Sequence, residues 1–410
     1  MRLDRRRFVT AAAAGAPLSL ASLAGARAAG RARITGVKRL ALKVIRPVGT
    51  YPDFLNRPRV VNIGGGGFVE VYTDQGITGI GPDIDPALLP AVNAVLKGAD
   101  PFDINLLAVR LYNLPTGDNT TAMPVKFRGS ASVEVAVWDL IGKIVQQPLY
   151  KLWGGGRDRI TAYASMLRLS TPEERAQQAL RQKAEGWKAI KVRAGYATMG
   201  EDIRLVEAIR KAVGDDYVVM VDANKAILGD GVAEGTRWSF DRAAKTALAY
   251  QRMGVYLLEE PFARADLDHL ADLNRLLTMN LAGGEGNRGI PEFRTLLERG
   301  IFDIVQPEIQ IEGPNHLRQI AVMAQVLNRM CIPHQGDSRL GTVCTMHLVA
   351  SWPESVAPYF ELFNDQPIGD YTYPFAVFEN PPALQADGSF ALPQGPGLGV
   401  SIREDYVERS

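Results

Sequence analysis

The chain has 410 residues, a formal net charge of +1 and 46% hydrophobic residues. This length allows a large buried core and more than one domain, and the composition excludes a disordered or fibrous protein. Because the charges nearly balance, we expect a small molecule or a protein as the partner and not nucleic acid. The two cysteines, Cys331 and Cys344, exclude a disulfide framework; we expect buried free thiols, with one bridge as the alternative.

The first 28 residues differ in composition from the rest. Asp4-Arg-Arg-Arg-Phe8 precedes an alanine-rich apolar stretch from Ala11 to about Gly25, and Ala26-Arg-Ala28 has the small-x-small form of a cleavage site. The pattern predicts a twin-arginine export signal over residues 1–28 and a periplasmic location. The apolar stretch is too short and too rich in Ala and Gly to span a bilayer comfortably, and no membrane span is expected in the mature chain.

Residues 33–155 are predicted to form a first domain of mixed α/β structure. Ile34 to Val44 and Gly67 to Tyr72 have the pattern of strands. Ser130 to Gln146 is predicted to be a helix because its apolar residues repeat with helical spacing. Three glycines, 154–156, then mark the expected boundary.

Residues 160–364 show a regular alternation of short apolar runs and helical patterns. Eight parallel strands that alternate with helices are what a closed barrel requires. The tail over residues 365–410, rich in Pro, Gly and aromatic residues, is expected to return to the first domain. The predicted barrel strands are 160–166, 189–192, 217–221, 255–258, 281–284, 301–306, 330–333 and 356–362.

Three acidic residues, Asp222, Glu259 and Glu285, each end an apolar run in this region. Carboxylates at the carboxyl ends of successive barrel strands converge on one point. Oxygen ligands without Cys or His partners suit a hard divalent cation, and we expect Mg²⁺. Each acid alone would also fit as a cap of the following helix, but three in consecutive units favour a metal site.

Two cations and a fourth acid lie at other strand ends. Lys191 and Arg193 form a Lys-x-Arg pair, and the period of two points both into the barrel. They are predicted to neutralise a substrate carboxylate or to take a proton. Two surface cations are the alternative reading, which is disfavoured because an inner barrel strand has no solvent face. Glu361 follows Tyr359-Phe360 near the end of the last predicted strand, where a barrel delivers catalytic groups.

Histidine is scarce, with four in the chain, and only His334 lies at a strand end. A carboxylate such as Glu308 beside it would fix its tautomer and raise its basicity, as in a His–acid dyad. Glu308 also fits the pattern of an ordinary loop acid. His347 lies in an apolar helix, and we expect it to be structural.

Taken together, these residues resemble the enolase superfamily, in its mandelate racemase and muconate lactonising enzyme branch. The resemblance extends from about Arg33 to Val407 and rests on the order and spacing of several motifs. These are Phe68-Val-Glu-Val-Tyr72 with Gly76-Ile-Thr-Gly-Ile-Gly81, Ala136-Val-Trp-Asp-Leu-Ile-Gly-Lys143, Lys191-x-Arg193, Val221-Asp-Ala-Asn224, Glu259-Glu-Pro261, Gly284-Glu285, Gln306-Pro-Glu308 and Pro393-Gln-Gly-Pro-Gly-Leu-Gly399.

The resemblance implies a modified (β/α)₇β barrel and an α+β capping domain built from both ends of the chain. It also implies one Mg²⁺ per subunit on Asp222, Glu259 and Glu285, and removal of a proton α to a carboxylate to give an enediolate whose charge rests on the metal. Lys191 would add positive charge, and His334 with Glu308 would act as general base or as the acid that expels hydroxide. Glu361 matches a position that hydrogen-bonds the substrate carboxylate in some relatives.

Two residues depart from the common pattern. Many relatives with two-base chemistry have Lys where this chain has Arg193; a guanidinium hardly ever deprotonates, so Arg193 suits a bidentate carboxylate clamp better than a base. Glu308 stands in place of the commoner Asp and is longer by a methylene. If the loop after His334 shifts, Asp337 occupies the corresponding position instead.

The sequence therefore predicts an exported, Mg²⁺-dependent lyase that dehydrates an acid sugar or a related α-hydroxy acid to a 2-keto acid. A cycloisomerase, epimerase or racemase using the same enediolate is the alternative. A non-catalytic exported binding protein is a third reading. Substrate choice is assigned to capping-domain loops, Arg46 to Phe54 and a segment between Pro90 and Lys126. Since homo-oligomers are common among relatives, we expect one here.

Overall fold

The computed structural model describes residues 32–54, 57–114, 129–226, 237–336 and 339–408. The predicted export signal lies outside these ranges, as does the end of the segment between Pro90 and Lys126.

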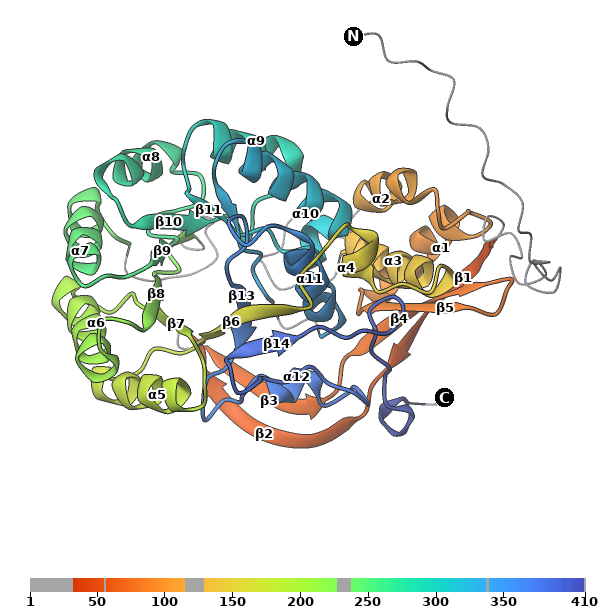
Figure 1. The fold of residues 1–410 in the computed structure, drawn as a ribbon, viewed down its shortest axis with the longest axis horizontal. Coiled ribbons are helices and arrows are strands. Elements are labelled where there is room, and N and C mark those ends of the chain that lie inside the picture. The colour runs from red at the N-terminus through yellow and green to blue at the C-terminus, as the bar shows by residue number, and fades with distance from the viewer. Residues whose placement is uncertain (1–31, 55–56, 115–128, 227–236, 337–338, 409–410) are drawn as a thin grey trace, which may run out of the picture. The chain divides into compact units, whose positions relative to one another are not determined.

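Eight parallel strands of the described chain form a curled sheet at the centre of the fold (Figure 1). The strands follow the order β12-β11-β10-β9-β8-β7-β6-β13. The Cys331 N–H in β12 donates to the Val356 carbonyl, just before β13, at 2.9 Å, so the two ends of this order lie side by side. The predicted barrel is thus confirmed. Its strands are β6 Arg159–Ser165, β7 Ala189–Arg193, β8 Val218–Asp222, β9 Leu257–Glu259, β10 Asn280–Gly283, β11 Ile304–Val305, β12 Met330–Cys331 and β13 Phe360–Phe363.

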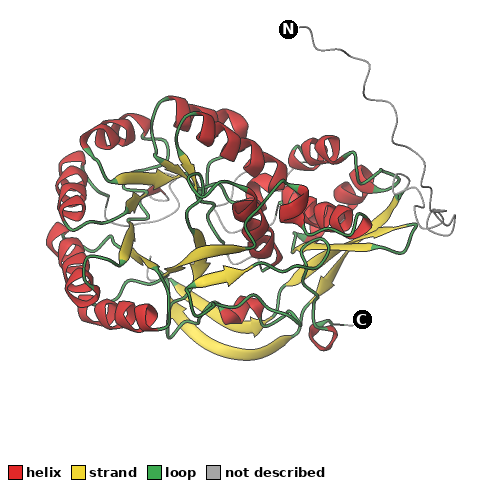
Figure 2. Cartoon of the chain, in the orientation of Figure 1, coloured by secondary structure: helices red, strands yellow, loops and turns green. Residues whose placement is uncertain are grey.

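Helices surround this sheet on its outer side, as Figure 2 shows. Several begin at clear caps; Thr198, for example, forms a capping box with Glu201 before α6. Gly313, with φ of 72°, and the following Pro314 interrupt α10. The helices of the barrel are α5 Pro172–Ala184, α6 Met199–Val213, α7 Phe240–Arg252, α8 Leu267–Leu276, α9 Gly289–Glu298, α10 Ile309–Val326 and α11 Leu340–Ser351.

A layer of buried side chains fills the inside of the barrel. Because side chains alternate along a strand, the residue two positions further on faces the same interior, nearer the carboxyl ends of the strands. The next layer therefore holds Lys191, Asp222, Glu259 and His334, each two residues beyond a member of the filling layer. That filling layer consists of Tyr163, Ala189, Met220, Leu257, Ala282, Ile304 and Ile332.

The capping region packs a second sheet against helices. Its three antiparallel strands run in the order β1-β4-β5. Gly79 lets a helix lie directly on this sheet, because a Cβ there would come within 2.1 Å of the Ala136 carbonyl oxygen. The elements are β1 Ile34–Ala41, β4 Gly67–Thr73, β5 Thr78–Pro82, η2 Pro86–Leu88, α1 Leu89–Leu96, α2 Ile104–Tyr112, η4 Ser130–Ser132, α3 Val133–Ile144 and α4 Leu149–Leu152.

A hairpin of two long strands was not predicted. β2 (Val44–Pro52) pairs antiparallel with β3 (Pro58–Gly64), whereas the sequence predicts one strand ending at Val44 and then a loop. Two register shifts in β2 break the alternation of apolar and polar residues from which a strand is predicted. The hairpin curves past the side of the barrel (Figure 1).

The C-terminal tail returns to the capping region. The Lys43 N–H donates to the Tyr406 carbonyl at 2.8 Å, and the Glu408 N–H donates to the Ala41 carbonyl at 2.9 Å. The tail also adds an antiparallel strand to β6. The exact domain boundaries given above stay a prediction. The tail contains α12 Thr372–Phe375, β14 Ser389–Ala391 and η6 Glu404–Tyr406.

Two smaller predictions are confirmed. Cys331 and Cys344 are both buried and free. His347 is buried and structural: its Nε2 lies 3.1 Å from the Leu398 carbonyl, and its Nδ1 accepts from the Tyr150 N–H at 3.4 Å.

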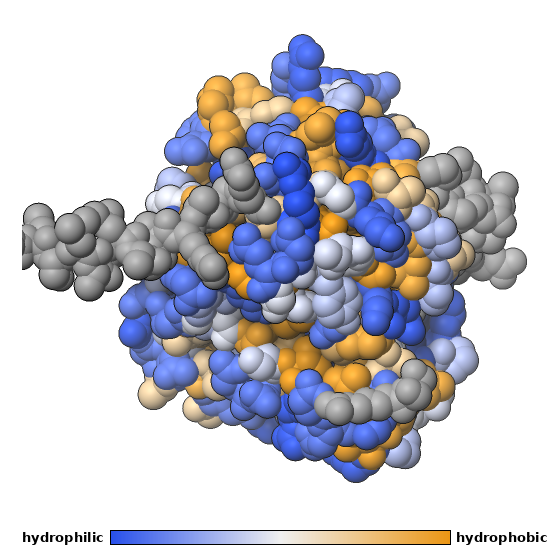
Figure 3. Space-filling view, turned by 90° about the vertical axis from the view of Figure 1, so that its right-hand side faces the viewer, coloured by the Kyte–Doolittle hydropathy of each residue, from blue (hydrophilic) through white to orange (hydrophobic). Residues whose placement is uncertain are grey.

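The face formed by the capping region mixes hydrophilic and hydrophobic residues (Figure 3). Among the helices of the described ranges, none has both the length and the apolar character needed to cross a membrane.

Candidate active site

The structure brings the predicted site residues together at the carboxyl ends of the barrel strands. Lys191 and Arg193 share β7 and each of the others belongs to a different strand end, and the side chains form ion pairs across the mouth of the barrel. They are Lys191, Arg193, Asp222, Glu259, Glu285, Glu308, His334 and Glu361, all less than one-tenth exposed except His334.

Lys191 lies at the centre of this network. Its Nζ is 2.6 Å from Glu259 Oε2 and 2.7 Å from Glu361 Oε1, and the side chain is fully buried. Burial alone would lower the pKa of Lys191, but the two carboxylates outweigh it and raise the pKa above its ordinary value. Lys191 is therefore held as a cation and suits stabilisation of negative charge.

Arg193 is held rigidly beside it. Its Nε donates to the Met166 carbonyl at 2.6 Å, and its Nη1 binds Asp222 and lies 3.3 Å from the Asn224 side-chain oxygen. A guanidinium bound in this way keeps its proton, so Arg193 provides positive charge and hydrogen-bond donors and not a base.

The three predicted metal ligands stand at the ends of adjacent strands. Asp222 of β8 pairs in register with Glu259 of β9. Glu259 in turn pairs with Ala282 of β10, three residues before Glu285. The order of the strands thus places all three carboxylates along one arc of the barrel mouth.

The structure differs from the prediction in how these carboxylates are arranged. Within the described residues, no three His, Cys, Asp or Glu side chains are grouped so that they could hold one metal ion. Three like charges repel at short range, and each is stabilised by the nearest cation. The pairs are Asp222 with Arg193, Glu259 with Lys191 and Glu285 with His334.

The donor set nevertheless fits a hard cation. All three side chains provide only oxygen. Glu259 Oε2 accepts from Lys191 and from Gln306, but its buried Oε1 has no hydrogen-bond partner among the described residues. An unpaired buried carboxylate oxygen is costly, and a bound cation would satisfy it.

His334 and Glu308 form the predicted dyad. His334 Nδ1 lies 2.8 Å from Glu308 Oε2, and its Nε2 lies 3.1 Å from Glu285 Oε2. Burial would lower the pKa of His334, but the charges of Glu285, Glu308 and Glu361 raise it to about 10. In this arrangement the imidazole is protonated at neutral pH and can donate a proton. The competing candidate, Asp337, lies outside the described residues.

Glu361 links the two sides of the site. Its Oε1 accepts from the Ser165 hydroxyl at 2.7 Å as well as from Lys191, and its Oε2 accepts from the Gln335 N–H at 3.2 Å. Burial would raise the pKa of Glu361, but Lys191 and His334 lower it to about 2. Glu361 is therefore ionised.

Four site residues were missed as candidates. Ser165 and Gln306 contact Glu361 and Glu259, and Asn224 donates to Asp222 from its side chain at 2.9 Å. Burial and the charge of Glu285 raise the pKa of the fourth, Glu260, well above its ordinary value. The alternation of side chains along a strand would have identified Ser165 and Gln306, which lie two residues beyond Tyr163 and Ile304 of the filling layer.

The hairpin β2–β3 reaches the site from the capping region. Phe54 lies in the turn of this hairpin. Its ring stacks over the guanidinium of Arg193, whose Cζ atom is 5.5 Å from the ring centroid. Such a contact shields the cation from water on one side. This observation places one end of the predicted Arg46–Phe54 selectivity segment against a candidate catalytic residue.

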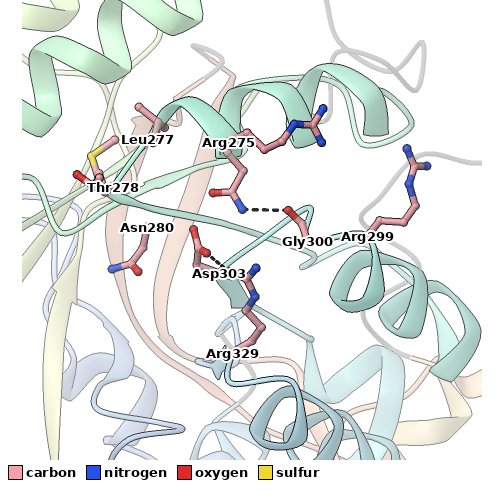
Figure 4. A pocket seen from close by; sticks show the side chains of 10 residues that line it. Arg275, Leu277, Thr278, Asn280, Arg299, Gly300, Asp303 and Arg329 are labelled. Carbon is pink, nitrogen blue, oxygen red and sulfur yellow. Dashed lines mark hydrogen bonds and ion pairs between the residues drawn. The ribbon is translucent and has the colours of Figure 1, made fainter.

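A separate pocket lies at the opposite end of the barrel. Its volume is about 430 Å³, and it is lined by residues that begin or precede β10, β11 and β12, including Asn280, Asp303 and Arg329 (Figure 4). Its arginines are paired with aspartates, as Arg329 is with Asp303. The pocket is thus remote from the carboxylate network at the carboxyl ends of the strands.

This fold and this arrangement of acids, lysine and histidine define a family. Residues 174–406 match the enolase C-terminal domain-like family, and residues 66–154 match the N-terminal domain of mandelate racemase and muconate lactonizing enzyme. The chain belongs to the enolase superfamily. It is an enzyme, and the enzymes of this superfamily include lyases and isomerases.

Similar proteins include enzymes with different outcomes. An arabinonate dehydratase from Saccharolobus solfataricus is 28% identical over 69% of this chain and 72% of its own length. A D-galactarolactone cycloisomerase from Agrobacterium fabrum is 29% identical over 83% of this chain and 89% of its own. The crystal structure of a racemase from Streptomyces coelicolor with bound magnesium has a TM-score of 0.73, with 25% identity over 90% of this chain and 97% of that one.

Proposed function

We propose that this protein is a Mg²⁺-dependent dehydratase that converts an acid sugar or a related α-hydroxy acid into a 2-keto acid. The observation that carries the proposal is the position of His334, hydrogen-bonded through Nδ1 to Glu308 and facing the carboxylate network through Nε2. An imidazole held in this way can protonate a departing hydroxyl group.

The substrate carboxylate would be bound by cations. Arg193 and, while it is protonated, Lys191 both lie in β7 and supply positive charge, and Glu361 offers a further polar contact. Mg²⁺ held by Asp222, Glu259 and Glu285 would supply the charge that makes the proton next to the carboxylate acidic.

Dehydration requires one residue that accepts the α-proton and one that protonates the leaving hydroxyl group. Lys191, in the neutral form that becomes accessible once Glu259 holds a cation, would take the α-proton. The β-hydroxyl group takes a proton from His334 and leaves as water, and the resulting enol ketonises to the 2-keto acid. Similarity to the arabinonate dehydratase supports this reaction class.

Racemisation or epimerisation is the second candidate, supported by similarity to the S. coelicolor racemase. It requires a base on each face of the substrate. Arg193 occupies the position where a second lysine base would stand, and its guanidinium keeps its proton. This single substitution favours dehydration. Cycloisomerisation, the reaction of the A. fabrum relative, remains an outcome of the same test.

Export and assembly belong to the same proposal. The twin-arginine pattern over residues 1–28 supports delivery to the periplasm of a protein that is already folded. A homo-oligomer is proposed from the resemblance to the family. Fractionation of cells that express the full chain, and sedimentation of the mature protein, test these two points.

The test of the reaction is to incubate the mature protein with Mg²⁺ and a panel of acid sugars in D₂O. NMR would follow both 2-keto acid formation and α-proton exchange. Keto acid from one substrate supports the proposal. Exchange or isomerisation without keto acid would assign the protein to the epimerases or cycloisomerases. The absence of both signals would favour a binding protein.

A further inference from the structure

Arg339 joins the start of α11 to the capping region. It lies just before α11, and its two terminal nitrogens donate to successive backbone carbonyls: Nη1 to Gly65 at 2.8 Å and Nη2 to Gly64 at 2.9 Å. A planar guanidinium presents its donors in a fixed fork, which suits two neighbouring oxygens better than a lysine ammonium does.

The turn that Arg339 binds has a fixed shape. Gly64, Gly65 and Gly66 have φ values of 79°, 74° and 72°, a conformation that other residues adopt only at a cost. A Cβ on Gly64 would come within 2.3 Å of the Lys43 carbonyl, and the Gly65 N–H donates to that same carbonyl at 2.8 Å. The turn therefore holds both carbonyls toward the barrel.

Arg339 itself has a strained backbone. Its φ is 48°, although it carries a side chain. Such a conformation persists only where the surroundings hold it, and it is found often at functional sites.

The two residues directly after His334 are bound to the candidate catalytic acids. The Gly336 N–H donates to Glu308 Oε2 at 3.0 Å, and the Gln335 N–H donates to Glu361 Oε2 at 3.2 Å. Gln335 and Gly336 are thus anchored in the site, and Arg339 anchors the start of α11 to the capping region.

The Gly64–Gly66 turn also ends the hairpin β2–β3. The other end of that hairpin carries Phe54, which lies over Arg193. The hairpin is therefore attached to the barrel mouth at two points, Phe54 and the turn bound by Arg339.

We propose that Arg339 is a positioning residue that fixes the start of α11 against the hairpin β2–β3, so that His334 and the hairpin keep their places on either side of the substrate. The kinetic part of this proposal rests on the proposed function. The conformational part does not.

The test compares Arg339→Ala and Arg339→Lys with a matched control, Arg210→Ala. Arg210 also binds backbone carbonyls, donating to Met253 and Tyr217 at 2.9 and 2.7 Å, but it does so at the amino-terminal end of β8. Removing it alters a similar contact at the far end of the barrel.

The first readout is hydrogen exchange of the backbone amides, which requires no substrate. In Arg339→Ala we expect exchange to rise by about tenfold both in residues 58–66, which Arg339 binds directly, and in residues 330–336, which end three positions before it. Arg339→Lys should restore part of the protection. Arg210→Ala should leave both segments unchanged.

The second readout is steady-state kinetics with the substrate found by the panel. We expect KM to rise by about tenfold in Arg339→Ala, with a smaller fall in kcat and partial recovery in Arg339→Lys. A residue with only a structural role would lower the melting temperature and leave KM as it was.

Three outcomes would overturn the proposal: unchanged exchange in both segments, increased exchange in residues 58–66 alone, or equal effects of Arg339→Ala and Arg210→Ala on KM. If the wild type turns over no acid sugar, the proposed function fails, and the exchange data alone decide whether Arg339 joins the two segments.

Discussion

His334 Nδ1 lies 2.8 Å from Glu308 Oε2, although 26 residues separate the two in the chain. The two residues also form a parallel β-bridge, so the backbone of the barrel sets this distance. Because His334 Nδ1 is hydrogen-bonded to Glu308, its Nε2 atom faces the site. A His–acid pair of this kind is built into the fold and does not depend on a flexible loop.

Replacing His334 by Asn should reduce 2-keto acid formation by about 10²-fold or more, the usual contribution of a general acid. Exchange of the substrate α-proton should continue, because His334 acts on the departing hydroxyl group. Glu308→Gln should have a smaller effect, since the amide still contacts Nδ1. Loss of exchange together with keto acid in the Asn variant would identify His334 as the base instead.

Mg²⁺ should stabilise the folded protein through Asp222, Glu259 and Glu285. At a concentration about 100 times its Kd, a ligand raises the free energy of unfolding by about 2.7 kcal/mol. Urea denaturation with Mg²⁺ or with EDTA measures this difference. The effect should vanish in Asp222→Asn and persist in Asp241→Asn, where an exposed aspartate paired with Lys245 is changed. Equal stabilisation of both variants would place the metal elsewhere.

Phe54 should contribute to substrate binding through Arg193. Removing the ring in Phe54→Ala exposes the guanidinium to water and weakens its hold on a carboxylate, which we expect to raise KM by up to about tenfold. Phe54→Tyr keeps the ring and serves as the matched control. An unchanged KM in the Ala variant would show that the contact has no part in binding.

The free energy of unfolding should fall in mild acid because of His347. Burial lowers the pKa of this side chain to about 4, against a weaker opposite effect of the Leu398 carbonyl. Between pH 6.5 and 4 the unfolded chain binds a proton that the folded chain does not, so stability is lost as the pH falls through this range. From pH 7 to pH 5 the loss should be about 2 kcal/mol.

Urea denaturation of the wild type and of His347→Gln at these two pH values isolates this effect, since the remaining titratable groups are common to both proteins. The wild type should lose more stability than the Gln variant. If both lose the same amount, His347 does not titrate as described.

The barrel and most of its site could be predicted because a single rule governs them. Ile332 and His334 illustrate it: the first fills the barrel, and the second, two residues later, faces the same interior at the carboxyl end. Apolar runs that end in a charged residue reveal this pattern without any knowledge of tertiary contacts.

Other features depend on contacts that no local pattern indicates. The strand Val44–Pro52 contains register shifts that hide its alternation. Arg339 follows a loop and resembles any surface arginine, yet it binds carbonyls 274 and 275 residues away. Asp222 pairs with Arg193 because the neighbouring carboxylates repel one another and each is stabilised by the nearest cation. The spacing of residues in the sequence does not reveal this balance of charges.

The measurement that most directly tests the account is the position of deuterium in the product formed in D₂O. If an enol forms by loss of the β-hydroxyl group and then ketonises, the 2-keto acid carries solvent deuterium at C3, the former β-carbon. We predict this product, formed only with Mg²⁺ present and lost in His334→Asn. Recovery of the substrate inverted or exchanged at C2, with no keto acid, would contradict the assignment as a dehydratase.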